Sequence, residues 1–158
     1  MPRATVRTMK ASQVEMTELV LPNDTNQLGN LLGGRLMHWI DIAAAIAAAR
    51  HTNRVCVTAS VDELNFLHPV RLGDVVVLRA SVNRVFHTSL EVGVKVIAQN
   101  NRTGEVTHTN TAFLTFVAID DSGTPVPAPP IQASTPAERR RYNEAARRRQ
   151  IRLRHRRR

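Results

Sequence analysis

The chain has 158 residues, of which 42% are apolar and only 4% aromatic, and its formal net charge is +9. This length suits one domain with a core of Val, Leu, Ile and Ala rather than of large rings. The longest apolar run, residues 42–49, falls far short of the ~20 residues of a membrane-spanning helix, and the first twelve residues lack the apolar stretch of a signal peptide. A single cysteine, Cys56, excludes an intramolecular disulfide framework, so we expect a soluble cytoplasmic protein.

All of the excess charge lies at the carboxyl end of the chain. Residues 137–158 carry eleven arginines against two glutamates, whereas the remaining 136 residues carry eleven basic and eleven acidic side chains. The basic character therefore belongs to a tail, and the rest of the chain is electrically balanced.

The first third of the chain predicts a strand followed by a long helix. Residues 13–20 alternate enough for a strand, and the polar residues 21–30, with Pro22, Gly29 and three asparagines, predict a turn-rich connection. From about Gly33 to His51 the chain has no helix breaker, and eight Ala or Ile residues follow Asp41. This pattern predicts a helix that is apolar on nearly all sides and therefore buried.

After this helix the sequence pattern changes to that of strands. Alternating and β-branched sequences predict strands over residues 55–70, 75–86, 90–98 and 105–120, and in the third of these Leu90 and Val92 alternate with Glu91 and Gly93. Short connections favour antiparallel neighbours. The simplest arrangement is an α+β fold in which one antiparallel sheet of about five strands wraps around the central helix.

The carboxyl end predicts a domain boundary and a second helix. Residues 121–136 hold five of the eight prolines, so we interpret residues 1–120 as one domain and residues 121–136 as a linker. The arginine-rich tail, residues 137–158, has good helix formers through about Leu153 and is predicted to form a basic helix.

Asp41 is the most informative single position. It lies two turns into the apolar helix, too deep for a capping residue or a partner of the helix dipole, and no Lys or Arg stands three or four residues away. Burying an unpaired carboxylate is costly, and desolvation disfavours its charged form, which suits a general base. We interpret Asp41 as a functional carboxylate; the alternative is that it faces solvent or a subunit interface.

Residues 29–34 (GNLLGG) form the second candidate feature. Paired glycines at the start of a helix let a ligand approach the backbone, where free N–H groups bind an oxyanion or a phosphate. The segment matches neither a P-loop nor a dinucleotide-binding motif, because no Lys-Ser/Thr pair follows and the GxGxxG spacing is absent. Taken alone, it is a glycine-rich turn.

Four stretches of the chain together resemble the bacterial and animal cytosolic acyl-CoA hydrolases of the hotdog superfamily. They are residues 21–41, 55–76, 85–96 and 111–120, and the similarity runs in continuous order over about residues 13–120. The resemblance implies a hotdog fold and an acyl-CoA thioesterase that releases a fatty acid and coenzyme A. It implies a homodimer, three copies of which form a hexamer. It implies no cofactor beyond the coenzyme A of substrate and product.

The same resemblance implies roles for individual residues. Asp41 corresponds to the catalytic carboxylate, acting as general base or nucleophile, and Asn30 to an asparagine that pairs with it across the dimer interface. Backbone N–H groups near Gly33 and Gly34 would stabilise the oxyanion. Because this chain has one such domain, two copies must meet to build each site. The expected coenzyme A contacts are Thr58, Ala59 and Ser60, then His87, Thr88 and Ser89, and a tail arginine, Arg149 or Arg148.

Two other functions are compatible with parts of the sequence. The arginine tail suits a nucleic-acid or acidic-surface binding protein, but its one aromatic residue, Tyr142, offers no base-stacking surface, so we do not expect nucleic acid as a partner. A hotdog enzyme of another reaction type, such as a dehydratase, generally uses a His–Glu or His–Asp pair, which the GNxxGG…D arrangement does not favour. Six scattered histidines without a cysteine cluster predict no metal site.

Overall fold

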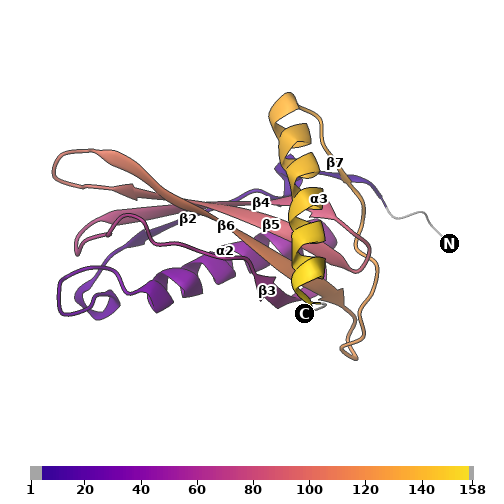
Figure 1. Ribbon diagram of the computed structural model, residues 1–158, viewed down its shortest axis with the longest axis horizontal. Coiled ribbons are helices and arrows are strands. Elements are labelled where there is room, and N and C mark those ends of the chain that lie inside the picture. The colour runs from indigo at the N-terminus through magenta and orange to yellow at the C-terminus, as the bar shows by residue number, and fades with distance from the viewer. Residues whose placement is uncertain (1–4, 157–158) are drawn as a thin grey trace.

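A five-stranded antiparallel sheet curls around one long helix in the computed structural model, which describes residues 5–156 (Figure 1). The helix, α2, spans Gly33–Thr52. From one edge of the sheet to the other, the strands are β2 (Val14–Leu19), β4 (Val75–Val85), β5 (Ser89–Gln99), β6 (Val106–Ile119) and β3 (Val55–Val61). The α+β class and the hotdog arrangement expected from the sequence are confirmed.

One side of α2 packs against the inner face of the sheet. Its buried residues include Ile40, Ala43 and Ala47, and they join strand residues such as Leu78 and Val92 in one apolar core. Alanine favours the helix, and its small side chain lets the helix approach the strands closely. The helix ends at Asn53, whose left-handed φ of 53° lets its N–H donate to the carbonyl of Ala49 at 2.7 Å.

The other side of α2 remains open in the single chain. Ile42 and Ile46 lie one turn apart on this side and are 36% and 38% exposed. The prediction of a helix buried on nearly all sides is therefore wrong for this side. An exposed apolar stripe of this kind marks a surface that another protein surface can cover.

β3 differs most from the strand predictions. Only residues 55–61 of the predicted strand 55–70 are in the sheet, and β3 pairs with β6 at the far edge and not with β4. The expectation of antiparallel neighbours is wrong at this connection. Residues 62–74 reach ~40 Å when extended, which exceeds the ~20 Å width of a five-stranded sheet, so the chain can cross the sheet instead of turning back.

Four short elements at the periphery have no counterpart in the sequence predictions. They are β1 (Arg7–Thr8), α1 (Met9–Ser12), the 3₁₀ helix η1 (Pro22–Asp24) and β7 (Ile131–Gln132). β1 and β7 pair in parallel, and Nε2 of the buried His51 donates to the carbonyl of Pro129 at 2.7 Å. The proline-rich segment is thereby tied to the body of the protein.

The arginine-rich tail forms α3 (Pro136–Arg156), which crosses the face of the sheet opposite to α2 (Figure 1). Thr135 caps the helix, because its Oγ1 accepts the N–H of Glu138 at 3.1 Å. The helix continues past Leu153, the predicted end. None of the helices within residues 5–156 is long and apolar enough to cross a membrane.

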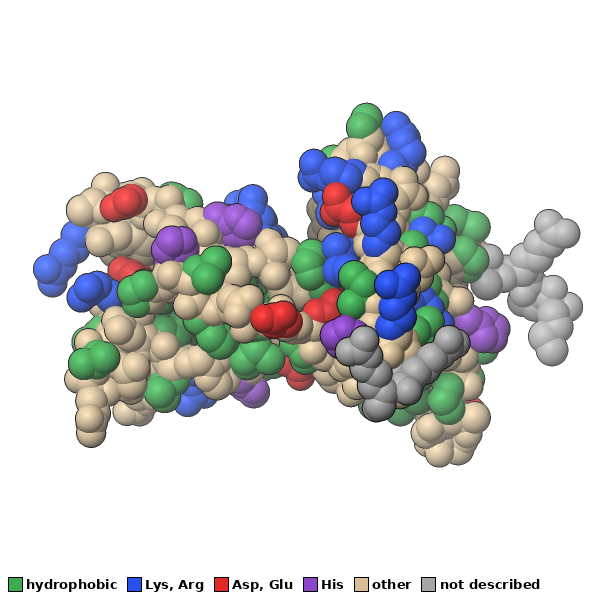
Figure 2. Space-filling view, viewed as in Figure 1, with side chains coloured by type: hydrophobic (Ala, Val, Ile, Leu, Met, Phe, Trp, Pro, Cys, Tyr) green, Lys and Arg blue, Asp and Glu red, His purple; other side chains and the backbone are tan. Residues whose placement is uncertain are grey.

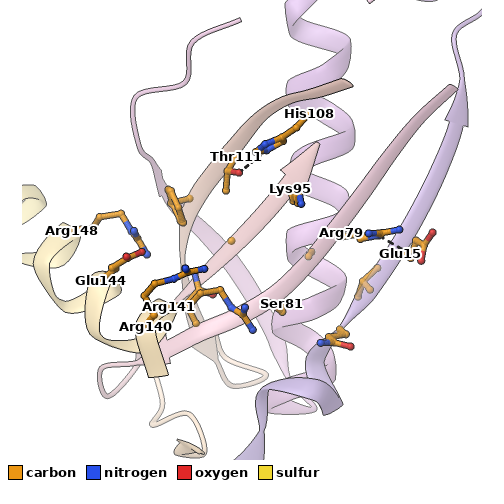
Figure 3. Close-up of a pocket in the computed structure, with 16 residues that line it drawn as sticks. Glu15, Arg79, Ser81, Lys95, His108, Thr111, Arg140, Arg141, Glu144 and Arg148 are labelled. Carbon is orange, nitrogen blue, oxygen red and sulfur yellow. Dashed lines mark hydrogen bonds and ion pairs between the residues drawn. The ribbon is translucent and has the colours of Figure 1, made fainter. Parts of the chain in front are cut away.

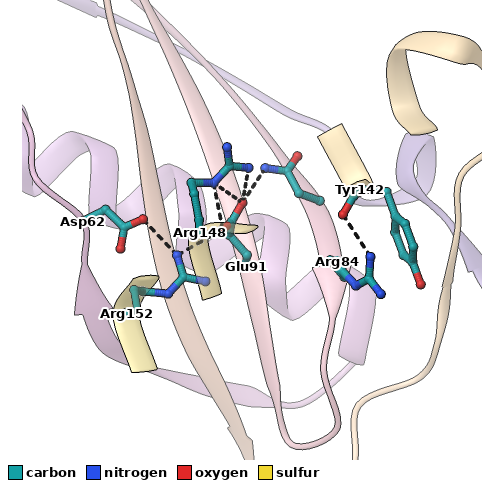
Figure 4. A network of polar contacts seen from close by, with 7 residues as sticks. Asp62, Arg84, Glu91, Tyr142, Arg148 and Arg152 are labelled. Atoms are coloured by element: carbon teal, nitrogen blue, oxygen red, sulfur yellow. Dashed lines mark hydrogen bonds and ion pairs between the residues drawn. The ribbon is translucent and has the colours of Figure 1, made fainter. Parts of the chain in front are cut away.

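The contact between α3 and the sheet is centred on Glu91 of β5, a carboxylate with no exposed surface (Figure 4). Arg148 donates to its Oε1 at 2.7 Å, and Nη1 of Arg152 donates both to its Oε2 at 3.1 Å and to Asp62 at 2.8 Å. Nδ2 of Asn83 donates to Oε1 at 3.0 Å. Removing Glu91 would leave the largely buried Arg148 without a carboxylate partner, so the network holds α3 in one position.

Candidate active site

Asp41 of α2 and Thr58 of β3 meet at the edge of the sheet. Oγ1 of Thr58 donates a hydrogen bond to Oδ1 of Asp41 at 2.7 Å, the short distance typical of a hydroxyl bound to a carboxylate. Thr58 can make this contact because it faces α2, as does Phe116, its register partner on β6. The hydrogen bond fixes the direction in which the second carboxylate oxygen points.

Asp41 is half-buried and not fully enclosed, which corrects the expectation of a carboxylate surrounded by apolar side chains. It lies beside Ile42 on the open side of α2. Within residues 5–156 the structure gives it no Lys, Arg or His partner, and Thr58 supplies its only side-chain hydrogen bond. An unpaired carboxylate on an open apolar surface is available to a substrate or to a second protein copy.

The loop before α2 is tightly closed on itself. The N–H of Asn26 donates to the carbonyl of Asn30 at 2.9 Å, and Oδ1 of Asn26 accepts the N–H groups of Leu28 and Asn30 at 2.9 and 3.2 Å. The turn needs Gly29, whose φ of +77° few other residues adopt. The Nδ2 donor of Asn26 makes no hydrogen bond within the described residues, so this amide can bind a further group.

The first turn of α2 offers backbone donors without side-chain competition. Its N-cap residue, Leu32, gives no side-chain hydrogen bond, so the N–H groups that begin the helix remain available. A Cβ added at Gly33 would lie 3.4 Å from the Phe66 ring, an ordinary contact, and Gly34 has open space around it. Asp41 is eight residues further along, ~12 Å from Gly33 along the helix axis. One copy of the chain therefore cannot bring its own helix start to its own Asp41.

Thr58, Ala59 and Ser60 lie at a β-bulge on an exposed sheet edge. The register of β3 against β6 shifts between Thr58 and Ser60, which leaves Ala59 as the extra residue. A bulge interrupts the pairing and exposes backbone N–H and C=O groups, and such bulges are frequent next to active sites. All three residues are exposed in the single chain.

His87 and Thr88 lie in the turn between β4 and β5, Ser89 begins β5, and Arg149 of α3 lies against them. Nη1 of Arg149 donates to Oγ of Ser89 at 3.2 Å, and its guanidinium lies 4.4 Å from the centre of the Phe86 ring. Ser89 shares one row of the sheet with Val57, with a single strand between them. The two expected coenzyme A segments are thus ~10 Å apart.

The two candidate arginines have different surroundings. Arg148 is bound to the buried Glu91 and lies 3.6 Å above the centre of the Phe113 ring. Arg149 has no carboxylate partner among the described residues and keeps its charge next to the β4–β5 turn. Of the two arginines, Arg149 is therefore the one whose charge is not paired with a carboxylate.

Cys56 lies on β3 two residues from Thr58 but is a poor nucleophile. Burial raises the pKa of its thiol, and the hydrogen bond with Thr52 offsets this only in part. Cys56 is half-buried. A raised pKa lowers the fraction of reactive thiolate.

Comparison with known proteins identifies the family of the chain. The model of the thioesterase superfamily matches residues 28–105. An uncharacterised acyl-CoA thioester hydrolase of Bacillus subtilis is 46% identical over 142 residues, which cover 90% of this chain and 83% of the relative. The chain belongs to the thioesterase superfamily. The resemblance noted in the sequence is confirmed, and with it the expectation of a thioester hydrolase.

Solved structures of this superfamily share the fold closely. The acyl-CoA hydrolase of Bacillus cereus has a TM-score of 0.91 and 38% identity, and the match covers 94% of this chain and 91% of that one. The acyl-CoA hydrolase of Staphylococcus aureus in complex with butyryl coenzyme A and coenzyme A has a TM-score of 0.90 and 33% identity, with 96% and 93% covered. That hydrolase has also been solved with an aspartate, a threonine or an asparagine replaced by alanine, the last in complex with coenzyme A.

The sequence interpretation missed two residues of this thioesterase fold. Glu91 alternates with valines and was expected on a polar face, yet it is fully buried beneath α3. Asn26 was treated as one of several turn asparagines, although its Oδ1 organises the loop. Only the count of arginines in the tail hinted at an acidic partner, and no local pattern separated Asn26 from Asn30.

Proposed function

We propose that the protein hydrolyses acyl-CoA thioesters to a free acid and coenzyme A, with Asp41 as the catalytic carboxylate. The observation that carries the proposal is the Asp41–Thr58 pair: a carboxylate without a cationic partner, oriented by a 2.7 Å hydrogen bond, on the open side of the central helix. The names of the similar proteins support this substrate class.

The spacing of the substituted residues in the Staphylococcus aureus hydrolase supports the choice of residues. Its aspartate and threonine are 17 positions apart, as are Asp41 and Thr58. Its asparagine lies 15 positions before the aspartate, which is the separation of Asn26 from Asp41, whereas Asn30 lies 11 positions before. We therefore assign the site asparagine to Asn26 in preference to Asn30.

The chemical step needs one base and one oxyanion site. Asp41 removes a proton from a water molecule, whose oxygen attacks the thioester carbonyl carbon, or Asp41 attacks that carbon itself and water then cleaves the resulting anhydride. The C–S bond breaks as the tetrahedral intermediate collapses, and the coenzyme A thiolate leaves and takes up a proton. The helix-start N–H groups of Gly33 and Gly34 stabilise the oxyanion, and the amide of Asn26 orients the water or the carbonyl.

Each site is shared between two copies of the chain. Asp41 and the start of its own helix are ~12 Å apart, too far to act on one carbonyl group. A second copy that covers Ile42 and Ile46 would bring its own Asn26 loop and helix start to Asp41. The apolar residues exposed near this side, Leu28, Leu32 and Phe66, then become buried.

The expected assembly is a trimer of such dimers. An acyl-CoA thioesterase with a TM-score of 0.90 and 39% identity to this chain is hexameric, as is the thioesterase y2039 of Yersinia pestis. The edge strand β3 offers unpaired backbone groups along its length, and pairing with a second β3 would close this edge.

Coenzyme A is held at the β3 bulge and the β4–β5 turn. The pantetheine lies along Thr58, Ala59 and Ser60, whose exposed backbone offers hydrogen bonds. The phosphates bind Arg149 and the turn residues His87, Thr88 and Ser89. Arg149 is already fixed by Phe86 and Ser89, so it loses little conformational freedom on binding.

The test is a comparison of wild type with Asp41→Asn and Asp121→Asn, in which thiol release from butyryl-CoA and palmitoyl-CoA is measured. Asp121 is an exposed aspartate in the turn after β6 and serves as the matched control. We expect Asp41→Asn to lower kcat by roughly 10²- to 10⁴-fold, with an unchanged melting temperature and oligomeric state, and Asp121→Asn to keep the parental rate. Parental turnover by Asp41→Asn would rule out the assignment, and no thiol release by wild type from any acyl-CoA would rule out the activity.

A further inference from the structure

The arginines of α3 lie on two different sides of the helix. On the side toward the sheet, Arg148 and Arg152 bind the buried carboxylate of Glu91. Figure 3 shows that Arg140 and Arg141 also reach from the helix toward the strands. Because the ion pairs with Glu91 fix the rotation of the helix about its axis, its opposite side is held facing away from the protein.

This opposite side, the outer face of α3, is a continuous exposed row. Its members follow one another at spacings of three or four residues and therefore lie on one side of the helix; all of them are exposed: Arg139, Asn143, Arg147, Gln150 and Arg154. From the first residue to the last the row is ~22 Å long, and Figure 2 shows basic side chains gathered along the helix. The outer face is thus an extended, positively charged surface.

No carboxylate of α3 balances the charge of this row. Of its two glutamates, Glu138 is half-buried in the first turn, and Glu144 lines the groove between the helix and the sheet. Within residues 5–156, Arg139, Arg147 and Arg154 form no ion pair. The row therefore carries three positive charges that the described part of the chain does not compensate.

The stability of the helix does not explain these charges. A cation is favourable in the last turn of a helix, where Arg154 lies, but unfavourable in the first turn, where Arg139 lies. Arg147 is in the middle of the helix, beyond the reach of either end. An anionic partner outside the chain would stabilise all three arginines at once.

The length and composition of the outer face suit a membrane surface. A straight row of cations can contact several headgroups of a flat anionic surface together, and each arginine near such a surface adds to the binding. Ile151 follows Arg147 by four residues and precedes Arg154 by three; it is 52% exposed and can enter the headgroup layer. We propose that the outer face of α3 binds anionic phospholipid membranes, with the helix axis along the membrane plane.

Two other partners fit the outer face less well. Proteins that bind single-stranded nucleic acid use aromatic side chains on which the bases stack, but the one aromatic residue of α3, Tyr142, has its ring covered by the guanidinium of Arg84 at 3.9 Å. A second copy of the chain is disfavoured as well, because a two-fold contact would bring two rows of arginines together.

The outer face is separate from the residues proposed for thioester hydrolysis. Asp41 lies on α2, on the other side of the sheet from α3 (Figure 1), and Arg149 donates to Ser89 of β5. Substitutions on the outer face are therefore expected to change membrane binding without changing thiol release from butyryl-CoA in solution.

The test is co-sedimentation of the full chain with lipid vesicles at low and at high salt. We expect binding to vesicles of phosphatidylcholine mixed with phosphatidylglycerol, none to phosphatidylcholine alone, and loss of binding at high salt. Arg139→Gln, Arg147→Gln and Arg154→Gln combined should weaken binding about 100-fold, roughly fivefold for each arginine. If this triple variant melts at a lower temperature than wild type, Arg147→Gln alone decides, with an expected loss of about fivefold.

The matched control removes the same charge from other parts of the surface. Lys10 of α1, Arg54 after α2 and Arg102 in the β5–β6 turn are exposed, and their combined replacement by Gln should keep most of the vesicle binding. Equal weakening by the two triple variants would overturn the outer face as the binding surface. Absence of binding to the mixed vesicles at low salt would overturn the proposal altogether.

Two further measurements identify a different partner. Binding of random single-stranded RNA in the absence of vesicle binding would replace the membrane by nucleic acid. A smaller oligomer of the outer-face triple variant in sedimentation velocity would show instead that this face is a contact between copies. Because the readouts are binding and size, the proposal can fail while thioester hydrolysis stands, and the reverse also holds.

Discussion

Thr58 and Asp41 join the edge strand of the sheet to the central helix by a hydrogen bond of 2.7 Å between the hydroxyl and Oδ1. We predict that Thr58→Val lowers kcat about tenfold or more and changes KM little, because a hydrogen bond to a charged group contributes roughly 1.5–3 kcal/mol and here orients the reacting carboxylate. Thr58→Ser retains the hydroxyl and should keep most of the activity. Steady-state kinetics with butyryl-CoA measures both. A rise in KM with an unchanged kcat would assign Thr58 to substrate binding instead.

A site shared by two copies predicts complementation between inactive variants. Asp41→Asn and Asn26→Ala should each be inactive, but after unfolding and refolding as a mixture they should recover about a quarter of the parental activity, since half of the dimers are mixed and each has one intact site. Thiol release by the mixture is compared with that of each variant refolded alone. The same experiment with Asn30→Ala separates the two asparagines: if Asn30→Ala is active by itself, it is not the site residue. Absence of recovery would place Asp41 and Asn26 in the same copy's site.

The strand and helix patterns were enough to predict the layers of the fold, because each pattern depends only on residues that are close together in the sequence. The alanine run after Asp41 and the alternating valines of β4 and β5 fix a helix and two long strands by their own periodicity. The position of β3 could not be predicted this way, because residues 62–74 contain no signal for the direction in which they cross. The pairing of β3 with β6 depends on the whole assembled sheet.

The site was predictable only in part for the same physical reason. Asp41 is recognisable because its carboxylate departs from the apolar pattern of the neighbouring helix residues. Its partner Thr58 is 17 residues away and is one of many threonines, so only the packing of β3 beside α2 selects it. Glu91 likewise follows an ordinary alternating pattern, and its burial depends on α3, whose Arg148 is 57 residues further on.

Glu91 positions α3, and with it Arg149. We predict that Glu91→Gln lowers the free energy of unfolding by about 3 kcal/mol, because Arg148 and Arg152 then lose the buried charge that compensates theirs. It should also raise KM for acyl-CoA but leave turnover of acyl-pantetheine, which lacks the nucleotide, unchanged. Urea unfolding and the two substrate series are the measurements, with the exposed Glu105→Gln as control. Equal effects on both substrates would show a general loss of structure instead.

Gly93 leaves the space that Asn83 needs to reach Glu91. A Cβ at position 93 would lie 2.8 Å from Nδ2 of Asn83, so Asn83 would have to move away from the carboxylate. We predict that Gly93→Ala destabilises the protein by about 1–3 kcal/mol, and that the same change costs less in an Asn83→Ala background. Urea unfolding of the four proteins gives the coupling energy. Additive effects would show that the two residues do not interact.

His51 predicts how the stability of the protein depends on pH. Burial lowers the pKa of its imidazole below the ordinary value of 6.5, and the hydrogen bond to the carbonyl of Pro129 opposes this only in part. The unfolded chain therefore takes up the proton first as the pH falls, so the stabilisation is complete above pH 6.5 and is lost between pH 6.5 and the lowered pKa of the folded state. We expect the free energy of unfolding to fall by up to about 1.4 kcal/mol per pH unit in this range, and His51→Gln, which cannot be protonated, to lose this dependence. Urea unfolding from pH 8 to pH 5 measures this dependence in both proteins. If the free energy of unfolding changed with pH equally in both, other groups would cause the change, and the contact between α2 and the segment before β7 would not be sensitive to pH.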